Sequence, residues 1–182
     1  IETTREAIKF ISAHAGKPSL LAPKTPVSYD KFLRQTHKGA ELATQIESLA
    51  EKITSLRNES ATMLAQVENL RPWEELDVPL EKLNETASSV YFAGYLPEEE
   101  TEAVAEELKG LAAEIVKLEP APEGRAMVVF AHKSESLEVK QVLKDHEFTA
   151  VIFPKRTGFA KEIIADLTDA AEMKESLAEE LA

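Results

Sequence analysis

Histidine is the residue type in this chain with the widest chemistry, as a metal ligand or as an acid–base group. The chain has four, which are His14, His37, His132 and His146. None of them shows the i, i+4 spacing of a helical metal pair, and the sequence has no cysteine to complete a ligand set. We therefore expect histidines that lie on the surface or pack structurally, and neither a metal site nor a bound cofactor.

Consecutive glutamates are the other candidates for catalysis. Glu98, Glu99 and Glu100 could supply paired carboxylates for acid–base work. They directly follow Pro97 and open a predicted helix, where acidic side chains suit the positive end of the helix dipole. We therefore expect a solvated first turn. The sequence offers no nucleophile–base pair and no metal set, so it does not predict an enzyme.

Glycine, tryptophan and clustered basic residues could bind a ligand or a partner. The segment Gly94-Tyr95-Leu96-Pro97 lacks the second glycine and the following Lys-Ser/Thr of a phosphate loop. Trp73 could anchor a partner, because tryptophan is enriched in interface hot spots, but packing where a helix meets a small lobe is favoured. Lys155 and Arg156, with Lys161, could contact an acidic partner, although such a group is usually a solvated end.

The composition of the chain limits the functions that these residues could have. The chain of 182 residues is 43% hydrophobic and only 6% aromatic, so its core is predicted to be aliphatic. The net charge of −12 argues against nucleic-acid binding, which needs clustered lysine and arginine. The sequence shows neither an apolar run that could span a membrane nor a signal peptide. Its first residue, Ile1, and its end at Ala182 inside a helical pattern lead us to expect a piece of a longer polypeptide.

A heptad pattern is the strongest structural signal in the sequence. Apolar residues recur at alternating spacings of four and three, interrupted by Ser60, until Arg71-Pro72-Trp73 follows. This spacing is typical of the seam of a coiled coil, and proline ends the helix because it lacks an N–H and clashes with the preceding turn. The predicted seam residues are Leu42, Ile46, Leu49, Ile53, Leu56, Met63, Val67 and Leu70.

A second helix at the end of the chain can supply the partner for this seam. Its predicted seam residues are Ile163, Leu167, Leu177 and Leu181, with Ala170 and Lys174 between them. The return helix is shorter than the outgoing helix. We therefore expect part of the outgoing seam to stay unpaired, or to be covered by residues 2–13 or by a second molecule, so that a dimer can form.

Between the two helices, the sequence predicts a small α/β unit. Helices over 98–111 and from Ser134 alternate with strands in the order β-α-β, turn, β-α-β, which is the split βαβ or ferredoxin-like arrangement. The strands are predicted where β-branched and aromatic residues gather, at 88–96, 113–118, 126–131 and 148–153.

The predicted fold class is α+β, a long antiparallel coiled-coil helical hairpin that carries a ferredoxin-like βαββαβ lobe. Ferredoxin-like units also serve as small-molecule sensors, so a regulatory ligand-binding domain is the alternative function. Such a domain would carry a glycine-rich loop after its first strand, and Gly94 matches that loop only weakly. The predicted division is a short helix and loop (1–26), a first coiled-coil helix (27–71), the lobe (72–157) and a second coiled-coil helix (158–182).

The segment from Leu70 to Leu80, which reads LRPWEELDVPL, resembles a segment of subunit I of prokaryotic V/A-type ATP synthases, the homologue of V-ATPase subunit a. The order of the predicted elements agrees with that family over roughly residues 2–182. The residues that carry the resemblance are Arg71, Pro72, Trp73, Leu76, Asp77 and Pro79 and, in a second motif, Gly94, Leu96 and Pro97.

The resemblance implies a stator part without catalysis of its own. The family's N-terminal cytoplasmic half has two α/β lobes joined by a coiled-coil hairpin, and this chain resembles the distal lobe with the adjoining helices. Such a lobe would dock peripheral stalks built from subunits E and G and would link them to the rest of subunit I. The membrane half of that subunit, which conducts protons or sodium ions, has no counterpart in this sequence. The resemblance thus implies a place at the cytoplasmic face of a membrane.

Overall fold

The computed structural model divides the chain into two compact units, and each unit is described by itself. The structure describes residues 2–14, 26–83, 85–153 and 155–182. The predicted loop that ends near Pro26 lies almost entirely outside these residues. The first unit comprises Ile1–Thr62 and Ala170–Ala182, and the second comprises Met63–Asp169.

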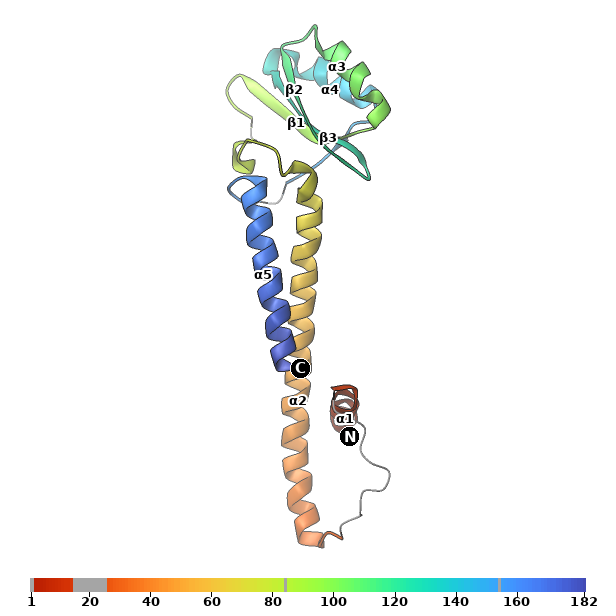
Figure 1. Ribbon diagram of the computed structural model, residues 1–182, viewed down its shortest axis with the longest axis vertical. Helices are drawn as coiled ribbons and strands as arrows, with labels where there is room; N and C mark the ends of the chain where they lie inside the picture. The colour runs from red at the N-terminus through yellow and green to blue at the C-terminus, as the bar shows by residue number, and fades with distance from the viewer. Residues whose placement is uncertain (1, 15–25, 84, 154) are drawn as a thin grey trace. The chain divides into compact units, whose positions relative to one another are not determined.

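The helices follow the apolar patterns of the sequence (Figure 1). The long helix ends at Leu70, just before Pro72, as the missing N–H of proline requires. The helix predicted over 98–111 is shorter, because Glu98–Glu100 forms a 3₁₀ turn and Gly110 follows the last helical residues. The helix bounds are α1 (Glu2–His14), α2 (Tyr29–Leu70), α3 (Thr101–Leu108), α4 (Ser136–Asp145) and α5 (Ala160–Leu181).

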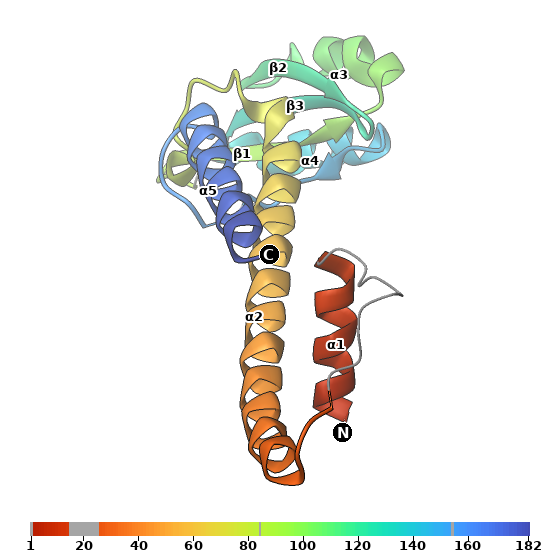
Figure 2. The ribbon, with the colours of Figure 1, turned by 60° about the horizontal axis from the view of Figure 1, so that its bottom comes forward.

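In the first unit, the end of α5 packs against α2. Ala178 is buried together with Ile53 and Leu56, and one turn of helix further the Ser60 hydroxyl donates a 3.0 Å hydrogen bond to the Ala171 carbonyl oxygen. Residues later in α2 thus contact residues earlier in α5, so the two helices run antiparallel here. Helix α1 lies alongside α2 (Figures 1 and 2), and its Phe10 packs against the same cluster.

Ile163 and Leu167 are buried and Leu181 packs beside Ala178, as the predicted seam of α5 requires, but at two other positions the buried residue is shifted by one. Ala171 and Ala178 are fully buried, whereas the predicted seam residue Leu177 is 40% exposed. Small side chains at these two positions let the backbone of α5 approach α2 closely enough for the Ser60 hydrogen bond. Ser60, expected to interrupt the seam, is therefore buried with its hydroxyl satisfied.

The outgoing seam is covered only in part. Leu42 is 56% exposed and Leu49 is 40% exposed, while Ile46 is half-buried. Ala43, one residue beyond the predicted seam, is buried, as is Ala7 of α1. The apolar side of α2 before Ile53 therefore remains largely open to solvent in this unit.

The second unit is built on a four-stranded antiparallel sheet with the order β2-β3-β1-β4. Strands β1 and β2 run parallel to each other with β3 between them, and α3 connects them. The second strand extends further than predicted, and the strand predicted over 148–153 is reduced to two residues. The strand bounds are β1 (Ser89–Leu96), β2 (Ala113–Ala121), β3 (Gly124–His132) and β4 (Thr149–Ala150).

Both faces of this sheet are covered. On one face, α3 and α4 lie side by side and bury alternate strand residues such as Leu96, Met127 and Val129 (Figure 1). The intervening residues, such as Ala93 and Val128, face the opposite side. There they pack against residues from the ends of α2 and α5 and from the segment between α2 and β1. The period-two alternation of each strand thus serves two separate apolar clusters.

Candidate functional site

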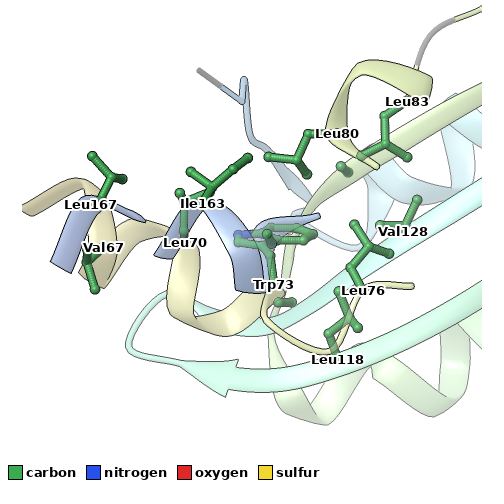
Figure 3. Packing of buried hydrophobic residues seen from close by; sticks show 13 residues of the cluster. Val67, Leu70, Trp73, Leu76, Leu80, Leu83, Leu118, Val128, Ile163 and Leu167 are labelled. Carbon is green, nitrogen blue, oxygen red and sulfur yellow. The ribbon is translucent and has the colours of Figure 1, made fainter. Parts of the chain in front are cut away.

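Trp73 lies at the centre of the second of these clusters, with 0% of its surface exposed. Its ring meets Phe153 edge-on with 4.9 Å between centroids and meets Tyr95 in a tilted arrangement at 5.6 Å. Both are favourable geometries for aromatic pairs. Figure 3 shows the indole close to Leu70 of α2 and Ile163 of α5. Trp73 therefore ties these two helix ends to one face of the sheet.

The residues that follow α2 make this position possible. Pro72 stands in the first turn of a 3₁₀ segment, η1 (Arg71–Trp73), where its missing N–H costs no hydrogen bond. The Glu74 N–H closes the turn by donating to the Arg71 carbonyl oxygen at 3.0 Å. Segment η1 packs on β2, so a single tight turn carries the chain from the helix onto the sheet.

The other residues of the LRPWEELDVPL segment divide between core and surface. Leu76 is buried in the same cluster as Trp73, Pro79 is half-buried, and Asp77 is exposed. Arg71 is exposed, and its Nε lies 2.9 Å from Glu68 Oε1. An exposed pair of this spacing contributes only about 0.2–0.5 kcal/mol. The segment therefore acts chiefly through its buried side chains.

A short loop before α5 closes over the end of this segment. The Leu80 N–H donates to the Gly158 carbonyl oxygen at 2.9 Å, and the Gly158 N–H donates to Glu81 Oε2 at 2.8 Å. The second bond lowers the pKa of Glu81. Gly158 has φ +112°, a conformation that favours glycine. The two bonds hold the entry to α5 against the residues that follow Trp73.

Gly94, Leu96 and Pro97, the second motif, lie at the end of β1. A Cβ on Gly94 would lie 2.2 Å from the Thr149 carbonyl oxygen and 2.5 Å from Phe148 Cζ, so the glycine lets β4 approach β1. Leu96 is fully buried and Pro97 is half-buried. Because β4 fills the space beside Gly94, this glycine does not form the ligand loop that a small-molecule sensor would need.

Two of the three glutamates after Pro97 form ion pairs within the unit. Glu98 binds Arg125 through both carboxylate oxygens, at 2.6 Å and 2.9 Å. The hydrogen bond from Arg125 lowers the pKa of Glu98 and keeps it ionised. Glu99 is exposed, as expected for a solvated turn. Glu100 takes part in an ion pair with a histidine.

That histidine, His146, lies between two carboxylates. Its Nδ1 lies 2.5 Å from Glu100 Oε2 and its Nε2 lies 3.1 Å from Glu107 Oε1. The hydrogen bond to Glu100, and then that to Glu107, raise the pKa of His146 against the opposing effect of burial. His132 instead pairs with the Ser134 hydroxyl at 2.8 Å. The side chains of the other two histidines lie outside the described residues.

His146 is expected to stabilise the folded chain more at acidic than at alkaline pH. Because its pKa is raised in the folded state, its contribution is fully present below the unfolded pKa of about 6.5 and is lost as the pH rises through the folded pKa. The urea midpoints of wild type and His146→Gln, measured from about pH 5.5 to about pH 9, should therefore converge as the pH rises. His132→Gln is the control, and a difference that grows with pH would contradict the assignment.

Within the described residues, no group of three or more His, Asp or Glu side chains could hold a metal ion. In the same parts of the chain, no helix has the length and apolar character to cross a bilayer. The predicted basic cluster lies at the surface: Lys155, Arg156 and Lys161 are all exposed. One guanidinium nitrogen of Arg156 donates to Gln66 Oε1 at 3.4 Å.

Sequence reasoning identified Trp73 and missed its partners. The sequence places Tyr95 in a predicted strand and in the Gly94–Pro97 motif, and Phe153 at the end of a predicted strand, and neither pattern indicates a contact with Trp73. The signal for Phe153 was its phase, since it shares alternation with Val151 and both pack against the Trp73 cluster. The Glu98–Arg125 pair joins residues far apart in sequence, and no local pattern indicates it.

Comparisons with known proteins address the fold. No protein-family model matches the chain, and no curated protein matches it. Among solved structures, the chain is similar to the crystal structure of the cytoplasmic N-terminal domain of subunit I, homolog of subunit a, of V-ATPase, with a TM-score of 0.56 and 17% sequence identity. The match covers 99% of this chain and 60% of that chain.

This likeness confirms, at the level of the fold, the resemblance that the segment after α2 predicts. The chain spans about 60% of the length of the solved structure that it matches. At 17% identity the comparison establishes architecture and leaves activity and partners as proposals. The chain thus shares its fold with part of the cytoplasmic N-terminal domain of subunit I, the homologue of V-ATPase subunit a.

Proposed function

We propose that the chain is a non-catalytic stator component of a rotary V/A-type ATPase or ATP synthase. The observation that carries this proposal is the structural likeness to subunit I over 99% of the chain. In this proposal the chain is the distal lobe with its adjoining helices. Residues 1–26 form a short helix and loop, 27–71 and 158–182 form an antiparallel coiled-coil hairpin, and 72–157 form a ferredoxin-like lobe.

Observations within each unit support the hairpin and the lobe. In the first unit the Ser60–Ala171 hydrogen bond and the buried Ala178 join α2 and α5 in antiparallel order. In the second unit Val67 of α2 and Leu167 of α5 share one apolar cluster. The strand order β2-β3-β1-β4, with helices on one face, is the order that a split βαβ lobe requires.

A stator part transmits force, and the packing around Trp73 suits that task. Close-packed protein interiors have low compressibility and transmit strain. The ends of two helices and one sheet face meet at a fully buried aromatic cluster, and the loop at Gly158 ties the same region by two hydrogen bonds. Force applied to the sheet would therefore reach both helices through packed side chains.

The proposed partners follow from the resemblance. The lobe would bind peripheral stalks of subunits E and G, and the helices would continue into the rest of subunit I with its proton- or sodium-conducting membrane domain. The chain would lie at the cytoplasmic face of that membrane. The open apolar side of α2 before Ile53 would be covered by further parts of subunit I or, in the isolated chain, by a second copy.

Titration with purified E/G heterodimer tests this function. A fluorescently labelled heterodimer should give a saturable rise in anisotropy with the 182-residue chain. Weak binding is compatible with the proposal, because further docking points in a whole complex would add avidity that this chain alone lacks. Failure to bind at any attainable concentration, by a chain whose circular dichroism shows it folded, would refute stalk docking by this part of subunit I.

A further inference from the structure

The sheet of the second unit has two edges, and they differ in how open they are to another strand. Strand β2 forms one edge. It carries Glu114, Lys117 and Glu119, and its register with β3 shifts between Lys117 and Pro120. Charges, proline and irregularity are the usual devices that keep an edge strand from pairing. The edge at β2 is therefore protected against a further strand.

The edge at β4 is short but carries no charged side chain. The six residues from Phe148 to Phe153 include no charge. The Val151 N–H donates to the Ala93 carbonyl oxygen at 2.8 Å, so antiparallel alternation turns the backbone groups of Ala150 and Ile152 away from β1. Among the described residues, the Ile152 N–H has no hydrogen-bond partner. Backbone donors and acceptors are therefore free to pair along this edge.

Ile152 also presents an apolar side chain to solvent. It is 95% exposed, the highest value among the exposed large hydrophobic residues of the described chain. A single exposed isoleucine needs no explanation, but this one stands on an unpaired strand edge. Ile152 lines two grooves, of about 400 Å³ and about 380 Å³, and Val151 and Phe153 line both as well. Side chains of an added strand would have room beside Ile152.

The charges near the β4 edge indicate what kind of segment could bind there. Lys155 and Arg156 line the larger groove, and the exposed Lys161 follows a few residues later. Such a basic group favours an acidic partner. The net charge of −12 on each copy of the chain opposes association of two copies by mutual repulsion. The larger groove also carries Glu81, whose carboxylate accepts from the Gly158 N–H, and the smaller groove carries Glu123, so the basic side chains lie in the larger groove alone.

We propose that the edge Thr149–Ile152 binds an extended acidic segment of a protein partner, which adds a fifth strand to the sheet and packs on Ile152. This mode of recognition takes affinity from main-chain hydrogen bonds and specificity from the flanking grooves. The inference deepens the proposed function, since it assigns the stalk heterodimer a docking surface and rests on that heterodimer being the partner. The segment that the sequence predicts as a strand over 148–153 would then be paired along more of its length.

Binding of labelled E/G heterodimer to variants of the 182-residue chain tests the surface. Ile152→Asp and the double variant Lys155→Glu, Arg156→Glu should each weaken binding at least about tenfold, because one adds a charge at the pairing edge and the other reverses the attraction. Leu137→Asp is the matched control, since Leu137 is 81% exposed on α4, and it should bind like wild type. Exposed positions tolerate these changes, and circular dichroism checks the fold of each variant.

Hydrogen exchange distinguishes strand addition from a side-chain contact. On binding, the amides of Ala150 and Ile152 should exchange at least about tenfold more slowly. If Ile152→Asp binds the heterodimer as tightly as the wild-type chain, or if exchange at these amides does not change, the fifth strand is overturned. The proposed function still stands in that case, provided that the wild-type chain binds the heterodimer. Failure of the wild-type chain to bind the heterodimer would overturn both the fifth strand and the proposed stalk docking. A dimer of the chain alone that Ile152→Asp converts to monomer would assign the edge to self-association and overturn the proposal.

Discussion

Replacing Trp73 by alanine is expected to lower the free energy of unfolding of the second unit by about 3–5 kcal/mol. The side chain has no exposed surface and contacts Phe153 and Tyr95, so its removal leaves a cavity among rings that cannot collapse freely. Domains are stable by only about 5–15 kcal/mol, so this is a large share. Urea unfolding should be followed by far-ultraviolet circular dichroism, because Trp73 is the chain's single tryptophan and its loss removes the fluorescence signal.

Trp73→Phe is the informative control for this prediction. The indole Nε1 is buried without a hydrogen-bond partner among the described residues, so phenylalanine gives up no hydrogen bond and keeps most of the aromatic contact. Its cost should therefore be well below that of alanine. A cost of less than about 1 kcal/mol for Trp73→Ala would be that of an ordinary substitution, and it would contradict the central position of this side chain.

The sheet of the second unit could be predicted because each strand carries its own signal. In β1 and β3, apolar residues occupy both faces, and the structure shows two apolar clusters that use alternate residues of each strand. Turn and helix signals between the strands set their order. Local patterns therefore sufficed for the order of strands and helices, and the antiparallel pairing of β2 with β3 follows from the short turn between them.

The elements that sequence reasoning misplaced are those whose limits depend on distant partners. Strand β4 ends at Ala150, although the Val151 N–H still bonds to β1, and two residues later Phe153 packs against the ring of Trp73. The phase of α5 follows the small residues Ala171 and Ala178, which permit close approach to α2. Leucine at 177 gave the stronger local signal, yet the backbone contact at Ser60 decides the register.

The sequence predicts where along the chain the candidate site lies, but not which residues meet there. A proline that ends a long apolar helix, followed at once by tryptophan, predicts a junction at Trp73. Its contacts come from β1 and from the segment after β4, and which aromatic residues meet there depends on sheet register. The open edge beside Ile152 is likewise invisible in sequence, since it exists only because β4 is the last strand of the sheet.

Replacing Gly94 by alanine is expected to cost about 1–3 kcal/mol, although the change adds only one methyl group. That group would lie 2.2 Å from the Thr149 carbonyl oxygen and 2.5 Å from the Phe148 ring. A backbone oxygen cannot rotate out of the way, so β1 and β4 must separate and the bond from the Val151 N–H to the Ala93 carbonyl lengthens. Urea unfolding monitored by Trp73 fluorescence reports the same unit and measures the loss.

Gly110→Ala separates this contact from the general effect of removing a glycine. A Cβ at Gly110 meets nothing within 4 Å, so alanine there changes only the freedom of the unfolded chain, which stabilises by about 0.4–1 kcal/mol where the backbone permits it. Gly94→Ala carries the same entropic gain and must overcome it to destabilise. Equal midpoints for the two variants would show that β4 does not lie against Gly94. A destabilised Gly94→Ala that also binds the stalk heterodimer more weakly would show that the position of β4 governs both stability and docking.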